Sequence, residues 1–163
     1  MEQDAESAEW LPPSSRHLIT ASHQVVISNS RGPESLRGLV GELGPSARAG
    51  TKEEAVRCDL VILCVHWRHA QEALKGIGWS GRILVDATNA HIDSPPDISL
   101  AGVTRSRAAL AKTGRTSSEL VAEWAPGARV VKSISNMPME WIDDFSENKP
   151  KTVNQPSPVC WPR

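Results

Sequence analysis

The sequence has little of what marks a secreted, membrane or nucleic-acid-binding protein. No apolar run approaches the length of a membrane span, and the acidic start of the chain lacks the basic and apolar regions of a signal peptide. Its net charge of −1 gives no electrostatic footprint for nucleic acid or an anionic membrane. The three cysteines are odd in number and form no CxxC motif, which excludes a disulfide framework. We therefore expect a cytoplasmic protein that binds neither nucleic acid nor membrane.

Glycine is also missing from the first part of the chain. Residues 1–13 contain none and end in Pro12-Pro13, so they are predicted to be an irregular lead-in. Residues 1–10 contain no apolar run able to form a strand. A fold that opens on a strand and a glycine-rich turn is therefore not expected from this region.

Short apolar strands alternate with amphipathic helices through the middle of the chain. Strands are predicted over residues 24–28, 46–49, 60–65, 81–86 and 128–134, and helices over residues 14–21, 33–43, 51–57, 68–75 and 116–124. This alternation predicts an α/β fold, a Rossmann-like doubly wound parallel sheet. We expect one domain over residues 14–145, with an irregular insertion over 90–113 that includes a short helix near Arg107, and a disordered tail over 146–163.

The segment His23–Pro33 carries the strongest functional signal. A β-branched run ends in Ser28-Asn29-Ser30-Arg31-Gly32-Pro33, and a helix follows at once. In a dinucleotide-binding fold an acidic residue at this place reads the 2′-hydroxyl of NAD, whereas a basic one accommodates the 2′-phosphate of NADP. Ser30 and Arg31 supply a hydroxyl and a guanidinium suited to a phosphate, which favours NADP as the cofactor. The alternative is an ordinary turn, because Ser, Asn, Gly and Pro all favour turns.

Four segments together resemble a known family. They read HQVVISNSRGPESL, DLVILCVHWRHAQEAL, GRILVDATNA and GRTSSELVAEWAPGARVVKSISNMP. Their order and spacing are similar to those of NADP-dependent oxidoreductases related to NADPH:deazaflavin-coenzyme (F-420) reductases and, more distantly, to the cofactor domain of pyrroline-carboxylate reductases. The resemblance covers the chain from about Arg16 to Trp141.

The resemblance implies a role for each matching position. It places the 2′-phosphate at Ser30 and Arg31, the adenosine side near Ser35, and the nicotinamide half beside Val65, His66, Trp67 and Asn89. His66 stands where the family has proline. Asn136 and Pro138 lie in the turn that the family uses near its second substrate, although the asparagine is displaced.

The resemblance also defines what is absent. Family members begin with a strand and a GxGxxG turn that cradles the pyrophosphate, and this sequence has neither. The sheet is therefore expected to be incomplete at the N-terminus, with the strands of Val26 and Ile62 each lacking a neighbour, and the chain to be a truncated form. Open sheet edges of this kind favour self-association into a homo-oligomer.

Two functions follow from these patterns. One is an NADP-dependent oxidoreductase that passes a hydride between NADP(H) and a small-molecule acceptor, deazaflavin- or flavin-like. The other is a non-catalytic truncated remnant that acts as a nucleotide-binding or interaction module, so turnover by this chain stays open.

Three further groups of residues are candidates for chemistry. His66 and His69 have HxxH spacing, but two imidazoles are too few for a zinc site, so no metal is expected. His66 also remains open as an acid or base. Cys64 lies in an apolar strand and is predicted to be inert core, and Asp86 is predicted to cap the turn that follows its strand.

Overall fold

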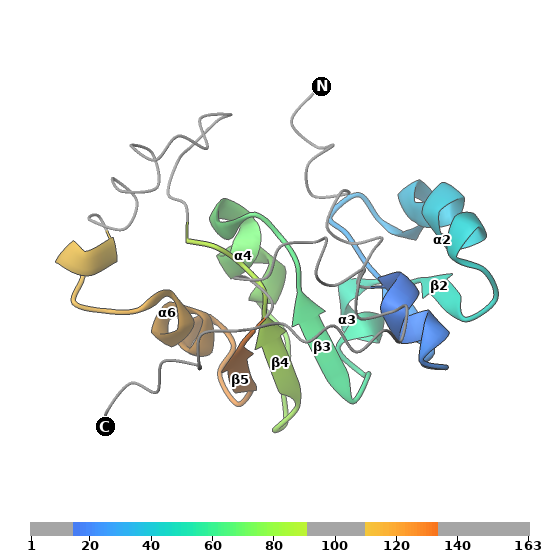
Figure 1. The fold of residues 1–163 in the computed structure, drawn as a ribbon. Helices are drawn as coiled ribbons and strands as arrows, with labels where there is room; N and C mark the ends of the chain where they lie inside the picture. Colours follow the sequence, from blue (N-terminus) through green and yellow to red (C-terminus); the bar gives the residue numbers. More distant parts are fainter. Residues whose placement is uncertain (1–14, 91–109, 134–163) are drawn as a thin grey trace, which may run out of the picture.

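The computed structural model describes residues 15–90 and 110–133, in which short strands and helices alternate (Figure 1). Residues 15–20 are helical and precede β1. The elements that follow are β1 (Val25–Ile27), the 3-10 helix η1 (Pro33–Leu36), α2 (Arg37–Leu43), β2 (Ala47–Ala49), α3 (Lys52–Ala55), β3 (Leu60–Leu63), α4 (Trp67–Leu74), β4 (Ile83–Asp86), α6 (Ser117–Trp124) and β5 (Arg129–Lys132).

All the strand pairs in the described residues are parallel, and they form two sheets. β1 pairs with β2, with Val25 opposite Ala47. β4 lies between β3 and β5, and its last residue, Asp86, is opposite Leu63 on one side and Lys132 on the other. The predicted α/β, Rossmann-like class is therefore confirmed. The described residues contain no strand pair between β1 and β3, and within them each of these strands has one neighbour. The missing neighbour expected for the strands of Val26 and Ile62 stays a prediction, because residues 1–14 lie outside the described residues.

Each sheet has its own hydrophobic core. In the smaller core, Leu36 and Leu43 from the η1–α2 segment pack on Ile27 and Ala47. The larger core lies between β3–β4–β5 and the helices α4 and α6, and it contains Leu63, Ala70, Leu74, Trp79, Leu84 and Val121. The α3 segment contacts both parts of the structure. Val56 at its end belongs to the larger core, while a Cβ added at Gly50, just before it, would lie 2.9 Å from Val26 of β1.

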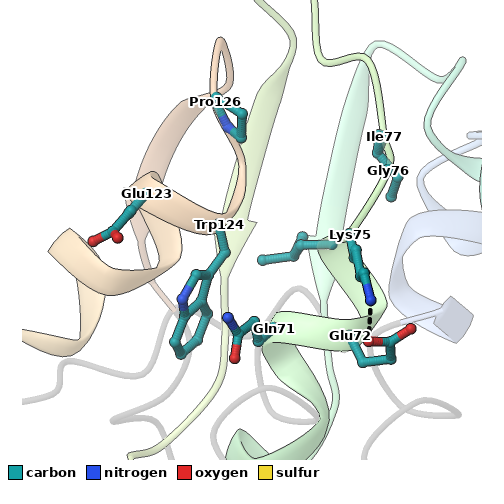
Figure 2. A pocket seen from close by; sticks show the side chains of 9 residues that line it. Gln71, Glu72, Lys75, Gly76, Ile77, Glu123, Trp124 and Pro126 are labelled. Carbon is teal, nitrogen blue, oxygen red and sulfur yellow. Dashed lines mark ion pairs between the residues drawn. The ribbon is translucent and has the colours of Figure 1, made fainter.

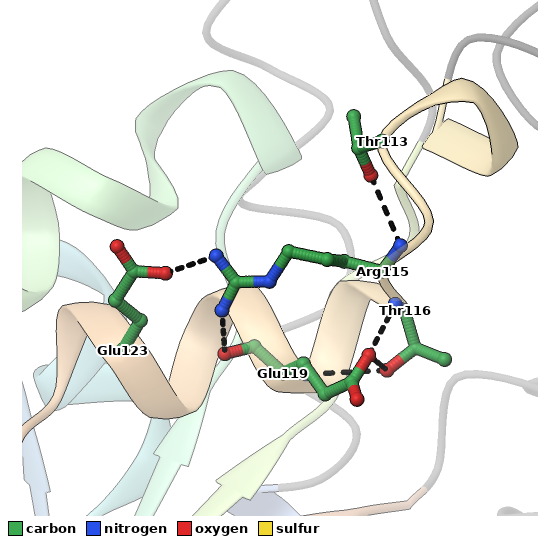
Figure 3. Close-up of polar contacts among 5 residues, drawn as sticks. All are labelled: Thr113, Arg115, Thr116, Glu119 and Glu123. Atoms are coloured by element: carbon green, nitrogen blue, oxygen red, sulfur yellow. Dashed lines mark hydrogen bonds and ion pairs between the residues drawn. The ribbon is translucent and has the colours of Figure 1, made fainter.

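The helices begin where the sequence provides caps. Thr51 and Thr116 each accept a hydrogen bond from the backbone N–H three residues later, and the glutamate at that position reaches back to the threonine backbone. In α6 the Thr116–Glu119 box is joined by Arg115, which pairs with Glu123 (Figure 3). These hydrogen bonds lower the pKa of the Glu119 carboxyl.

The differences from the predicted elements have local causes. The helix predicted over 33–43 starts as a 3-10 turn, with Pro33 at its first position after Gly32 at φ 86°. The strand predicted over 60–65 is Leu60–Leu63, and its first residue, Leu60, is 44% exposed; among the described residues β3 pairs only with β4. The predicted strand 128–134 is shortened to Arg129–Lys132.

Several predictions fall outside the described residues. They are the lead-in over 1–13, most of the insertion with its helix near Arg107, and the tail over 146–163. Among the helices that the structure does describe, none combines the length and the apolar character needed to cross a bilayer.

Candidate functional site

Most of the predicted site residues lie at one end of the sheets. The segments after β1, β3 and β4 all leave the strands at the same end, toward the top of Figure 1. The first carries Ser30 and Arg31, the second Val65 to Trp67, and the third Asn89. Ligands of open α/β folds bind outside these carboxyl ends. The structure therefore places these predicted residues along the edge where a dinucleotide site is expected.

The segment after β1 is a hydrogen-bonded loop organised by Asn29. The Asn29 Oδ1 accepts from the backbone N–H of Arg31 at 3.0 Å, and its Nδ2 donates to the Ser35 hydroxyl at 2.9 Å. That hydroxyl in turn donates to the Gly32 carbonyl at 2.7 Å. Asn29 thus fixes the direction of the backbone at Arg31, and Ser35 is a structural part of the loop. Its place near the adenosine side stays a prediction.

Ser30 and Arg31 project from this loop into solvent. Both are exposed, and within the described residues Arg31 forms no ion pair. The acidic residue of the adjoining turn, Glu34, lies 2.6 Å from the guanidinium of Arg37. The loop therefore exposes the Arg31 guanidinium and the Ser30 hydroxyl, while the Glu34 carboxylate of the adjoining turn is paired with Arg37.

The segment after β3 forms the start of α4. The carbonyl of His66 accepts the backbone N–H of His69 at 2.9 Å, so His66 is the N-cap residue, although its side chain makes no capping bond. The Trp67 ring packs on Trp124 of α6, with centroids 5.1 Å apart and an angle of 44° between the planes. The His69 Nε2 accepts from Arg68 at 3.0 Å. The described residues contain no group of three or more metal-ligating side chains, so the HxxH spacing builds no metal site within them.

Cys64 is a protonated thiol of the interior. Burial, and the nearby negative charge of Asp86, raise its pKa to about 11. A thiol with this pKa is a poor nucleophile at neutral pH. This agrees with the prediction that Cys64 is inert.

Asp86 is the centre of a buried polar network at the carboxyl ends of β4 and β5. It is fully buried, and its Oδ1 accepts from the backbone N–H of Thr88 at 2.9 Å and from the Thr88 hydroxyl at 2.6 Å. Its Oδ2 lies 3.1 Å from the Nζ of Lys132. The same ammonium donates to the Thr88 carbonyl. The capping role predicted for Asp86 is confirmed, and the ion pair is an addition to it.

Sequence reasoning missed three residues of this edge. Asn29 was within the motif but unassigned, and Thr88 and Lys132 were not singled out. The signal for Thr88 is the Asp-x-Thr spacing of a side-chain-capped turn. Lys132 could be found only through the alignment of β5 with β4, which places it opposite Asp86. Asn89 is exposed after β4, whereas Asn136 and Pro138 lie outside the described residues.

A groove of about 570 Å³ lies away from this edge, between the C-terminal parts of α4 and α6 (Figure 2). Trp124 forms one wall, and the Glu72–Lys75 ion pair, at 3.6 Å, lies on the other. None of the predicted site residues lines it. We place the candidate site at the carboxyl edge, because the Asp86–Thr88–Lys132 network and the loop of Ser30 and Arg31 both lie there.

Comparison with known proteins identifies a family that the chain resembles. Residues 15–90 match the family model described as "NADP oxidoreductase coenzyme F420-dependent". This segment is therefore similar to that family. The family resemblance expected from the sequence is thereby confirmed over the part of the chain that contains β1 to β4.

Within the solved structures there is a similar protein of the same fold. The crystal structure of a hypothetical protein from Sinorhizobium meliloti superposes with a TM-score of 0.62 and is 32% identical in sequence. The alignment covers 80% of this chain, and the chain spans 59% of the length of that structure. No curated protein matches the sequence.

Proposed function

We propose that this chain binds NADP(H) and takes part in hydride transfer between NADP(H) and a deazaflavin- or flavin-like acceptor. The observation that carries the proposal is the loop after β1, where exposed Ser30 and Arg31 follow a strand of the segment that matches an NADP oxidoreductase family model. The activity class comes from the family, and the residues present at the site are consistent with it.

The loop after β1 fits a 2′-phosphate chemically. A guanidinium presents a planar fork of N–H donors that matches phosphate oxygens, and the Ser30 hydroxyl adds another donor. The hydrogen bond from the Arg31 backbone to Asn29 fixes the direction of the loop before any ligand binds, which reduces the ordering cost of binding. No acidic residue stands between Ser28 and Pro33 to select the free hydroxyl of NAD.

The nicotinamide half would lie against the segments after β3 and β4, beside Val65, His66, Trp67 and Asn89. When bound, the cofactor supplies the hydride, and the protein supplies orientation and exclusion of water. The packing of Trp67 on Trp124 holds one wall of this region in place. Asn136 and Pro138 stay a prediction for the acceptor side.

A second candidate function is a non-catalytic module that binds nucleotide or a protein partner. It is favoured by the lack of a strand pair between β1 and β3 in the described residues. Unpaired strand edges are templates for pairing with another chain. Binding without turnover, or self-association, would characterise this function.

The experiment is titration of the folded protein with NADPH and NADH. Wild type should prefer NADPH, and Arg31→Ala should weaken NADPH binding by about 10- to 100-fold with little change for NADH, since one charge-assisted phosphate contact is lost. Arg37→Ala is the matched control, because Arg37 is an exposed arginine of the next element that is paired with Glu34. Its NADPH affinity should stay at the wild-type value.

Two outcomes would reject the proposal in different ways. Equal losses of NADPH and NADH in Arg31→Ala would remove the 2′-phosphate assignment. Selective NADPH binding with no NADPH oxidation in the presence of deazaflavin or flavin acceptors would favour the binding module. Circular dichroism of each variant establishes that the folded state is retained.

A further inference from the structure

Lys132 is a cation held in place at the carboxyl edge by a carboxylate that no solvent reaches. Asp86 is 0% exposed, whereas the Lys132 side chain is 32% exposed. The two residues are directly opposite each other at the ends of β4 and β5. The pair therefore runs from the interior of the larger sheet to its ligand-binding edge.

Stability alone does not explain a buried charge in this place. A buried ion pair is often no more stabilising than a well-packed apolar pair, because desolvation of the two ions offsets their attraction. Asp86 does more than form an ion pair with Lys132, since each of its two carboxylate oxygens accepts hydrogen bonds. Oδ1 holds the Thr88 turn and Oδ2 holds the Lys132 ammonium, which also donates to the Thr88 carbonyl. The network thus fixes the position of one ammonium group.

That ammonium has a donor left for a ligand. Lysine carries three N–H donors, and among the described residues the contacts to Asp86 and Thr88 account for two of them. Since the neighbouring carboxylate balances the charge, the pair presents a directed donor with little net charge. A neutral carbonyl oxygen suits such a donor better than an anion does, and a nearby cationic ring is not repelled.

The arrangement of the strands in two sheets indicates which carbonyl of the ligand Lys132 would contact. Dinucleotides lie across doubly wound sheets with one mononucleotide on each half. The 2′-phosphate loop belongs to the β1–β2 half, so the nicotinamide half falls on β3–β4–β5, where Lys132 lies. The nicotinamide ring carries a carboxamide oxygen and is cationic in its oxidised form.

We propose that Lys132 binds the carboxamide oxygen of the nicotinamide through its third N–H, with Asp86 and Thr88 as positioning residues. This role rests on the proposed NADP(H) function and adds a residue to it. On this proposal the Asp86–Lys132 pair contacts the nicotinamide end of the cofactor and does not contact the adenosine end.

The test compares NADPH with 2′-phospho-ADP-ribose, which keeps the 2′-phosphate but lacks the nicotinamide. Lys132→Met should weaken NADPH binding by about tenfold or more and leave 2′-phospho-ADP-ribose within about twofold of wild type. If Lys132→Met does not fold because Asp86 is left unpaired, the Asp86→Asn/Lys132→Met variant removes both charges and gives the same comparison. Equal losses for both ligands, or no loss for either, would refute the contact with the nicotinamide. A wild-type protein that binds neither ligand would overturn the proposed function itself.

Discussion

The Asp86–Lys132 pair allows a quantitative prediction of stability. Lys132→Met leaves a carboxylate that is 0% exposed without its cation. Breaking a buried pair in this way costs about 3–5 kcal/mol, and we expect about 2–3 kcal/mol here because Lys132 is one-third exposed and water can reach the vacated space. Asp86→Asn keeps an oxygen for Thr88 but turns an amide NH₂ toward the ammonium, at a cost of about 1–3 kcal/mol. In the double variant the neutral amide that replaces the Asp86 carboxylate no longer needs a cation, so the cost should be well below the sum.

The assay is urea unfolding of wild type, the two single variants and the double variant. We expect a coupling free energy of about 1.5–3 kcal/mol in this cycle. The exposed Glu72–Lys75 pair is the matched control, because it joins the same charge types at 3.6 Å with side chains that are 78% and 73% exposed. Its cycle should give less than about 0.5 kcal/mol. If the Asp86–Lys132 effects add to within about 0.5 kcal/mol, the carboxylate does not depend on the lysine and the reasoning is wrong.

Two further predictions concern the larger core. Because burial raises the pKa of Cys64 to about 11, the unfolded chain loses this proton first as the pH rises, so wild type should lose about 2–3 kcal/mol of stability between about pH 9 and pH 11. Chemical denaturation in reductant should show this loss in the control variant Cys58→Ala but not in Cys64→Ala. If the free energy of unfolding changes with pH equally in the two variants, the prediction is wrong. Trp79 is 1% exposed, and its indole N–H finds no acceptor in the described residues. Trp79→Phe should therefore cost less than about 1.5 kcal/mol in thermal unfolding and Trp79→Ala about 3–5 kcal/mol; similar losses for both would show that the N–H is bonded.

The elements could be predicted from the sequence because their signals are local. The capping boxes at Thr51 and Thr116 mark helix starts within a few residues. The apolar spacing of Leu36 and Leu43 likewise marks the face that packs on β1 and β2. The 3-10 start at Pro33 and the exposure of Leu60 were not predicted. The first depends on the backbone at Gly32, and the second on which strands become neighbours.

Part of the candidate site could be located from the sequence, for the same reason. Ser30 and Arg31 form a short motif whose meaning follows from a strand and a helix on either side of it. The link between Asp86 and Lys132 spans 46 residues and depends on the parallel register of β4 and β5, which no local pattern encodes. Contacts of this kind become visible only when the strands are aligned.

The two cores give the proposed ligand a structural role as well as a chemical one. The loop of Ser30 and Arg31 belongs to the half built on Ile27 and Leu36, and Lys132 belongs to the half built on Leu63 and Leu84. In the described residues no strand pair joins these halves. A dinucleotide held at both places would connect them, whereas 2′-phospho-ADP-ribose would contact the first at Arg31 and leave Lys132 free. Binding of any ligand to the native state adds to stability according to its affinity. If NADPH contacts both Arg31 and Lys132 as proposed, it should protect backbone amides of β4 and β5 from hydrogen exchange beyond what 2′-phospho-ADP-ribose does at equal saturation. Equal protection by the two ligands would show that the nicotinamide end does not reach the larger sheet.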